Sequence, residues 1–344
     1  MSENHLGILP SLEVMPLFAD RSDESGPIRD SLFRIKTYTS YGEIARHLLT
    51  SKLVASVIPL EIFVADVLGL PGQRNHWKIP VFINSCPTEL VLSPSIYRAL
   101  YPSQAEGQVK LPSRLIVGLQ SQNSLTKSQF QEWIKQWKGS ASIDVIYKML
   151  PLDLRIRALE AGAVDAIIAP SPWGLFAESI EIGKCDIRFT PGKFAQQLAL
   201  VCNKEFFESH RELACELPSM IASARHRLKQ PNGFIKAAEK MSRTCRPALA
   251  IDLLEKAATL HGFESLGPDV APDARDLTFA LAQLAEHSIL PAQVGAGENT
   301  ARLLLCDPAA PNTRDMNRSR KTEPVVPLPT AQLPGGSASI LQKT

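Results

Sequence analysis

The chain has 344 residues, of which 44% are hydrophobic and 21% are charged, and its 37 basic and 35 acidic side chains leave a formal net charge of +2. This length predicts two domains with substantial cores, and the composition is typical of a soluble globular protein. A net charge so close to zero argues against direct nucleic-acid binding and against an anionic membrane surface as the main partner.

The amino terminus shows no pattern of an export signal. The first apolar run, Leu6 to Leu9, is four residues long and stops at Pro10. A secretory signal needs an apolar run of about 7–15 residues, and no later stretch approaches the roughly 20 apolar residues of a membrane-spanning helix. We therefore expect a cytoplasmic protein with no membrane insertion.

Cysteine usage agrees with that location. The chain has no Cys-x-x-Cys pair and no alternating Cys/His spacing typical of a metal site. Scattered thiols in a cytosolic protein are mostly small buried hydrophobic groups. We predict free cysteines, no structural metal and no cofactor.

Strand-like and helix-like segments alternate along the first two-thirds of the chain. Phe33–Tyr38 alternates apolar and polar residues with the period of a half-buried strand, and Ser93-Pro94 is typical of a helix start. Predicted strands lie at 6–9, 33–38, 53–58, 79–84, 89–92, 114–119, 143–149 and 164–169. This alternation predicts βαβ units and a largely parallel sheet, and so an α/β fold.

The last third differs in character. Its apolar spacing predicts helices at Phe206–Lys229, Gly233–Ser242, Pro247–His261 and Asp273–His287. Residues 307–344 are rich in Pro, Ser, Thr and Gly, a composition that predicts a disordered tail.

Catalytic motifs are missing from the sequence. It holds no G-x-G-x-x-G after a strand, no phosphate-binding G-x-x-x-x-G-K-[ST], no G-x-S-x-G and no H-E-x-x-H. The absence favours a binding protein over an enzyme.

The loops that follow the predicted strands are more informative, because ligands of open α/β sheets bind at the carboxyl ends of strands where the strand order switches. Four such loops are Pro10-Ser11, Ser56–Leu60, Gln120–Thr126 and Pro170–Trp173. The polar loop Gln120–Thr126 fits an anion site and an ordinary helix cap equally well. Trp173, which we expect to be half-exposed, either forms a wall of a ligand pocket or packs under the helix that it begins.

Four segments in the same order resemble a known family. They are Leu6-Gly-Ile-Leu-Pro10 with Met15-Pro-Leu17, Leu92-Ser-Pro-Ser-Ile-Tyr-Arg-Ala-Leu100, Trp133-Ile-Lys-Gln-Trp137, and Ala161-Gly-Ala-Val-Asp-Ala-Ile-Ile-Ala-Pro-Ser-Pro-Trp173. Together they are similar to the nitrate/sulfonate/bicarbonate class of ABC-transporter substrate-binding proteins. The matches span residues 6 to about 235.

The resemblance implies the periplasmic-binding-protein type II fold, with two α/β lobes, a hinge and a ligand cleft. On that fold we expect lobe I at residues 1–100 and lobe II at 101–200. Hinge crossings would lie near 93–114 and 185–200, and residues 201–306 would return as helices that pack on lobe I.

The resemblance also implies a function. Members without a signal peptide resemble cytoplasmic nitrate/nitrite sensors, which hold an RNA-binding antiterminator protein inactive until the anion arrives. We therefore expect non-catalytic binding of a small nitrate-like or nitrite-like anion. The partner would be such a regulatory protein or, in a transport role, the other ABC-transporter subunits.

By resemblance and by their place after strands, nine residues are candidate ligand contacts. They are Pro10, Ser56, Pro59, Asn123, Ser124, Ser128, Ser171, Trp173 and Lys193. Lys193, in the turn Thr190-Pro-Gly-Lys193, either supplies a cation for a bound oxyanion or is an ordinary exposed lysine.

The sequence departs from the family pattern at three places near the expected cleft: Tyr41–His47, Cys86–Val91 and Ser171. The fold therefore transfers better than the identity of the ligand. An alternative is an enzyme on the same fold that acts on a menaquinone or thiamine precursor.

Overall fold

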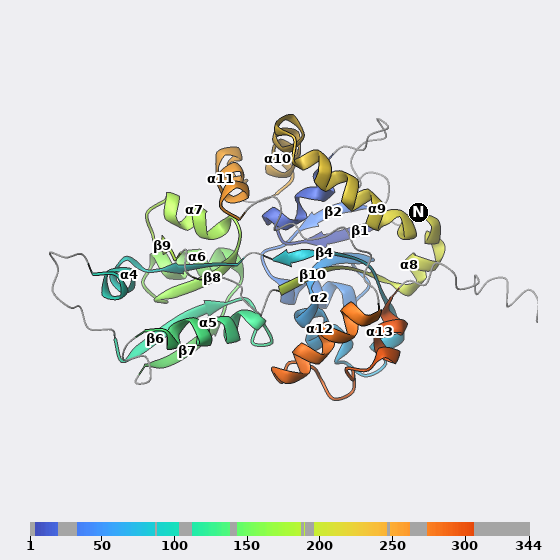
Figure 1. Ribbon diagram of the computed structural model, residues 1–344, viewed down its shortest axis with the longest axis horizontal. Helices are drawn as coiled ribbons and strands as arrows, with labels where there is room; N and C mark the ends of the chain where they lie inside the picture. Colours follow the sequence, from blue (N-terminus) through green and yellow to red (C-terminus); the bar gives the residue numbers. More distant parts are fainter. Residues whose placement is uncertain are drawn as a thin grey trace, which may run out of the picture. The chain divides into compact units, whose positions relative to one another are not determined.

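The structure is a computed structural model with two five-stranded sheets, each flanked by helices (Figure 1). It describes residues 4–19, 33–86, 88–102, 112–137, 143–186, 189, 196–245, 248–261 and 274–305. The two-lobed α/β fold expected from the sequence is confirmed. The tail at 307–344 lies outside the described residues.

The first sheet has the strand order β2-β1-β3-β10-β4. Its strands are β1 (His5–Ile8), β2 (Arg34–Thr37), β3 (Ala55–Pro59), β4 (Trp77–Cys86) and β10 (Gln196–Asn203). β1 runs parallel to β2 and β3, whereas β10 runs antiparallel to β3 and β4. β10, which overlaps the hinge crossing expected near 185–200, therefore lies inside this sheet.

Helices lie on both sides of the first sheet (Figure 1). The helix η1 (Leu12–Phe18) packs with α9 (Arg211–Leu228) and α10 (Pro231–Thr244). Near the other face lie α2 (Tyr41–Leu49), α3 (Leu60–Phe63) continuing into the π-helix η2 (Val64–Leu68), α12 (Ala274–Glu286) and α13 (Glu298–Leu304). The short helices η3 (Gln73–Asn75) and α8 (Lys204–Ser209) complete the first lobe.

The single helix predicted at Phe206–Lys229 is two helices, α8 and α9, because the chain breaks at His210, whose φ of −125° is not helical.

The second sheet has the strand order β7-β6-β8-β5-β9. Its strands are β5 (Thr88–Leu92), β6 (Arg114–Leu119), β7 (Asp144–Met149), β8 (Ala166–Pro170) and β9 (Lys184–Cys185). Its helices are α4 (Pro94–Leu100), α5 (Leu125–Lys135), α6 (Leu152–Glu160) and α7 (Trp173–Ser179).

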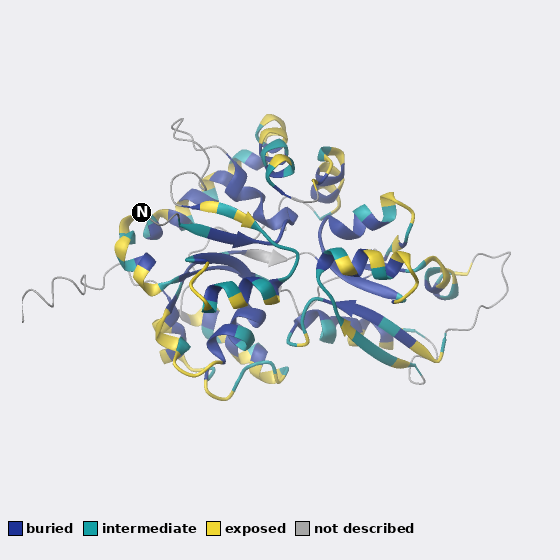
Figure 2. Ribbon diagram, turned by 180° about the vertical axis from the view of Figure 1, so that it is seen from behind, coloured by how far each residue is buried: buried dark blue, intermediate teal, exposed yellow. Residues whose placement is uncertain are grey.

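Side chains of the central strands alternate between the two faces of this sheet, as the period of a strand requires. Leu90 and Ile168 pack with Phe130 of α5 on one face. Val91 and Ile167 pack with α6 on the other face. Figure 2 shows the result: the central strands are mostly buried, and the helices that cover them have exposed outer sides.

Each sheet has two parallel and two antiparallel strand pairs, so the prediction of a largely parallel sheet was wrong. The reason is that β5 and β10, the first strands after each passage between the sheets, pair antiparallel with their neighbours, and antiparallel neighbours need no crossover helix. It leaves the first sheet between Cys86 and Thr88, earlier than the crossing expected near 93–114. It returns between Cys185 and Gln196.

The helix α11 (Ile251–His261) packs with α10 and η1 of the first lobe and also with α7 of the second. In the described part of the chain, Cys185, Cys202, Cys215 and Cys245 are free thiols. Within the described ranges, every helix is too short or too polar to cross a membrane.

The place of β10 inside the first sheet can be tested with Leu200→Ala. Leu200 is fully buried in β10, so the truncation should lower the free energy of unfolding by about 2–5 kcal/mol in denaturant titrations. The control is Leu260→Ala, at a residue that is 51% exposed on α11. A Leu200→Ala loss no larger than that of the control would contradict the position of β10.

Candidate functional site

The two parallel neighbours β1 and β3 send the chain to opposite faces of the first sheet. After β1 the chain enters η1, which packs with α9 and α10, and after β3 it enters α3, which packs with α2. The ladder between the two strands ends at the pair Gly7–Ser56. Strands that separate in this way form a topological switch point, where open α/β sheets bind ligands.

The second sheet has the same arrangement at β6 and β8. β6 leads into α5 on one face, and β8 leads into α7 on the other. Their ladder ends at the pair Gly118–Ile167. Each lobe therefore has one switch point, just beyond the carboxyl ends of two parallel strands.

Hydrogen bonds join these two switch points. The Leu12 amide donates to the Ser171 carbonyl at 2.8 Å, and the Trp173 indole Nε1 donates to the Pro10 carbonyl at 2.6 Å. The loop after β1 thus contacts the loop after β8.

Two further hydrogen bonds join the segments that follow other parallel strands of the two lobes. The Leu152 amide, at the start of α6, donates to the Thr39 carbonyl at 2.8 Å. The Asn123 Nδ2 donates to the Asp66 Oδ1 at 3.2 Å. The carboxyl ends of the parallel strands of both lobes therefore face one another.

Two buried hydroxyl groups lie at this junction. Ser11 and Ser171 are both fully buried, and neither Oγ has a hydrogen-bond partner among the residues that the structure describes. A buried polar group without a partner costs about 1–3 kcal/mol, so native proteins retain few of them. We take the two hydroxyls and the strand ends around them as the candidate site.

A buried cation lies beside this site. Arg155, in the first turn of α6, is fully buried, and its Nη1 donates to the carbonyl of Ile168 in β8. Burial lowers the pKa of the guanidinium to about 10, while Tyr41 and Asp153 oppose that shift. Arg155 is therefore still positively charged at neutral pH.

Three of the predicted residues meet at the junction: Pro10, Ser171 and Trp173. Trp173 is only 3% exposed, so the expectation of a half-exposed ring was wrong. Its indole lies between the lobes, where it reaches Pro10 and contacts Phe176 edge-on at 5.7 Å between ring centroids.

The other predicted residues lie at the edges of the site. The Ser56 hydroxyl donates to the Gly7 carbonyl at 2.9 Å, which ties β3 to β1, and Pro59 ends β3 as the N-cap of α3. Ser124 caps α5 by accepting from the Thr126 amide at 3.3 Å. Ser128 is partly buried within α5. Lys193 lies outside the described residues.

Ser11 was predicted only as part of the loop Pro10-Ser11, and Arg155 was not predicted as a site residue. A signal for Arg155 was present, because Leu152, Arg155, Ile156 and Leu159 share one face of the helix by their spacing. A charged residue on the apolar face of a helix indicates a buried charge.

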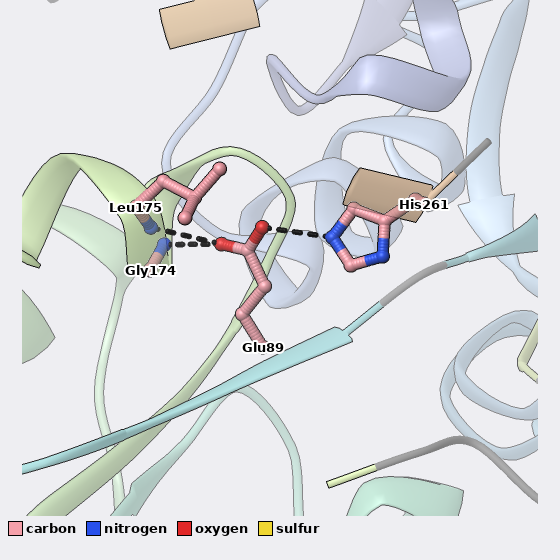
Figure 3. A network of polar contacts seen from close by, with 4 residues as sticks. All are labelled: Glu89, Gly174, Leu175 and His261. Atoms are coloured by element: carbon pink, nitrogen blue, oxygen red, sulfur yellow. Dashed lines mark hydrogen bonds and ion pairs between the residues drawn. The ribbon is translucent and has the colours of Figure 1, made fainter. Parts of the chain in front are cut away.

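Glu89 of β5 forms a second polar network between elements of both lobes (Figure 3). Its Oε2 accepts from the amides of Gly174 at 2.6 Å and Leu175 at 3.1 Å, at the start of α7. Its Oε1 lies 3.0 Å from Nε2 of His261, the last residue of α11. The carboxylate therefore connects the second sheet with α7 and with the helix that packs on both lobes.

Comparison with known proteins identifies the fold. The sequence matches no protein-family model and no curated protein. Solved structures are similar in fold, among them the periplasmic nitrate-binding protein NrtA from Synechocystis PCC 6803. That similarity has a TM-score of 0.62 at 11% identity over 93% of this chain and 89% of that one.

Two further structures have the same fold. The alkanesulfonate-binding protein SsuA from Xanthomonas axonopodis pv. citri, bound to MOPS, has a TM-score of 0.60 at 12% identity, over 89% of this chain and 98% of that one. The ligand-binding component of an ABC-type import system from Staphylococcus aureus, with zinc bound, has a TM-score of 0.60 at 12% identity, over 84% and 92%. The chain therefore has the fold of these substrate-binding proteins. The described residues hold no group of three or more His, Cys, Asp or Glu that could bind a metal ion.

The Glu89 network predicts a loss of stability for Glu89→Ala. The substitution leaves the Gly174 and Leu175 amides without their acceptor, so the free energy of unfolding should fall by about 1–3 kcal/mol. Glu178→Ala is the control, because its ion pair with Lys184 is partly exposed and should contribute no more than about 1 kcal/mol. Equal losses in both variants would contradict a structural role for Glu89.

Asp66 predicts a pH dependence of stability. Burial raises its pKa above the usual value, although the hydrogen bond from Asn123 opposes the shift. The folded state therefore disfavours the ionised carboxylate. As the pH rises from about 4 towards the pKa of Asp66 in the folded state, ionisation of this side chain lowers the free energy of unfolding. Asn does not titrate, so the free energy of unfolding of Asp66→Asn should increase relative to that of the unsubstituted protein as the pH rises over that interval. A difference that does not change with pH in denaturant titrations would contradict the prediction.

Proposed function

We propose that this protein binds a small nitrate-like or nitrite-like anion between its two lobes and does not catalyse a reaction. The observation that carries the proposal is the meeting of two switch points around the unpartnered hydroxyls of Ser11 and Ser171. Hydroxyl and amide donors at strand ends are suited to the oxygen atoms of a small anion.

A buried cation is available to an anionic ligand. Arg155 places a full positive charge beside the junction, under the start of α6. The similar folds include proteins described as binding nitrate and an alkanesulfonate, which are both oxyanions.

A hinge explains how binding would become a signal. Two chain crossings join the lobes, and contacts such as Leu12 to Ser171 form only when the lobes meet. A ligand shifts such an equilibrium by the extra contacts that it makes in the closed form. The change would be read inside the cell by a regulatory protein of the antiterminator type or, in a transport role, by ABC-transporter subunits.

The proposal predicts stabilisation by anions. Sodium nitrate, nitrite, bicarbonate or an alkanesulfonate should raise the melting temperature of the full chain above that in sodium chloride of equal ionic strength. A ligand at a hundred times its Kd stabilises the folded state by about 2.7 kcal/mol. The double variant Ser11→Ala and Ser171→Ala should keep its stability in chloride, because it loses only unpartnered hydroxyls, but should bind the anion about tenfold more weakly.

Ser179→Ala is the control, since that exposed hydroxyl donates to the Phe176 carbonyl of its own helix. No anion-specific shift in the unsubstituted protein would overturn the proposal. A shift only with a thiamine-pyrimidine or menaquinone-precursor compound would favour the enzyme alternative instead.

A further inference from the structure

Arg155 occupies a position where a helix normally places an apolar side chain. Its neighbours on the same face of α6 are Leu152, Ile156 and Leu159, which are all buried. Burying a guanidinium is costly unless the charge has partners. Burial accordingly lowers the pKa of the guanidinium to about 10.

Hydrogen bonding leaves one edge of the guanidinium open. Nη1 donates to the Ile168 carbonyl, whereas Nε and Nη2 have no partner within the described ranges. Nε and Nη2 form the edge whose two N–H bonds run parallel, and this edge matches two oxygen atoms of one anion.

The surrounding backbone is arranged around this side chain. Ile168 follows the last pair of the β6–β8 ladder and precedes Ser171 by three residues. Gly118 lies opposite, where a Cβ atom would come within 3.3 Å of the Arg155 Cγ and 3.1 Å of the Ile167 Cγ2. A side chain at 118 would therefore crowd the arginine at the switch point.

The first lobe also approaches Arg155. Tyr41, the first residue of α2, is 1% exposed and opposes the fall in the pKa of the guanidinium. The amide of Leu152, three residues before Arg155, donates to the Thr39 carbonyl of the same lobe. The arginine thus lies where the two lobes meet.

We propose that Arg155 is the specificity-determining residue of the anion site, and that its Nε–Nη2 edge binds two oxygens of one oxyanion. This inference rests on the proposed function and adds a selectivity to it. A planar or tetrahedral oxyanion places one oxygen on each N–H group, whereas a single halide ion must accept both N–H groups at one centre, with bent hydrogen bonds.

The test measures nitrate binding by calorimetry in a chloride buffer of constant ionic strength, so that only a preference for nitrate over chloride gives a signal. Arg155→Met should weaken nitrate binding about tenfold or more, because it removes two charge-assisted hydrogen bonds. Arg155→Lys keeps the charge but lacks the paired donors, so it should lose most of the preference for nitrate. Arg157→Met, at an exposed residue of the same helix, is the matched control and should bind like the unsubstituted protein.

Melting temperatures in chloride alone separate a binding role from a structural one. Arg155→Met should melt at the same or a higher temperature than the unsubstituted protein, because it removes a buried charge whose edge lacks a partner. A lower melting temperature together with unchanged nitrate affinity would overturn the inference and leave the proposed function intact. Absence of nitrate binding in the unsubstituted protein would overturn both.

Discussion

The hydrogen bonds between the loop after β1 and the loop after β8 are the contacts on which the rest of the site depends. The Leu12 amide and the Trp173 indole reach across from one lobe to carbonyls of the other. These bonds are short and buried, and they involve backbone groups that would otherwise lose their partners. Because they join two loops at strand ends, they also bring together the positions at which each sheet separates its strands.

This geometry concentrates polar groups in an otherwise apolar region. The core of the first lobe extends to Leu125, Leu152 and Trp173 of the second, so the hydroxyls at the junction and the Arg155 guanidinium lie in surroundings of low polarity. Electrostatic interactions are strong in such surroundings. An anion bound there would gain more from one arginine than it would at the surface, and the same surroundings make the unliganded arrangement costly.

Glu89 and Asp66 show two ways in which carboxylates act between the lobes. Glu89 accepts two amide hydrogen bonds from α7 at one oxygen and contacts His261 of α11 through the other, so both carboxylate oxygens have a polar partner. Asp66 has the Asn123 amide as a donor, and burial raises its pKa. We expect the Glu89 network to add to stability, whereas the ionised Asp66 carboxylate decreases it.

The sequence by itself determined the local structure and the loops at the strand ends, because apolar periodicity and the positions of proline and glycine act over short distances. β6 was predicted with its observed bounds, and the loops at Pro10 and Ser171 were named as candidates. Only the tertiary structure decided which loops meet, that β10 enters the first sheet, and that Trp173 is buried. These features depend on contacts between residues far apart in the chain, such as Pro10 with Trp173 or Glu89 with His261. Likewise, the apolar spacing of α6 carries a signal that Arg155 is buried, but only the fold brings its Nη1 to Ile168, one residue beyond the last pair of the β6–β8 ladder.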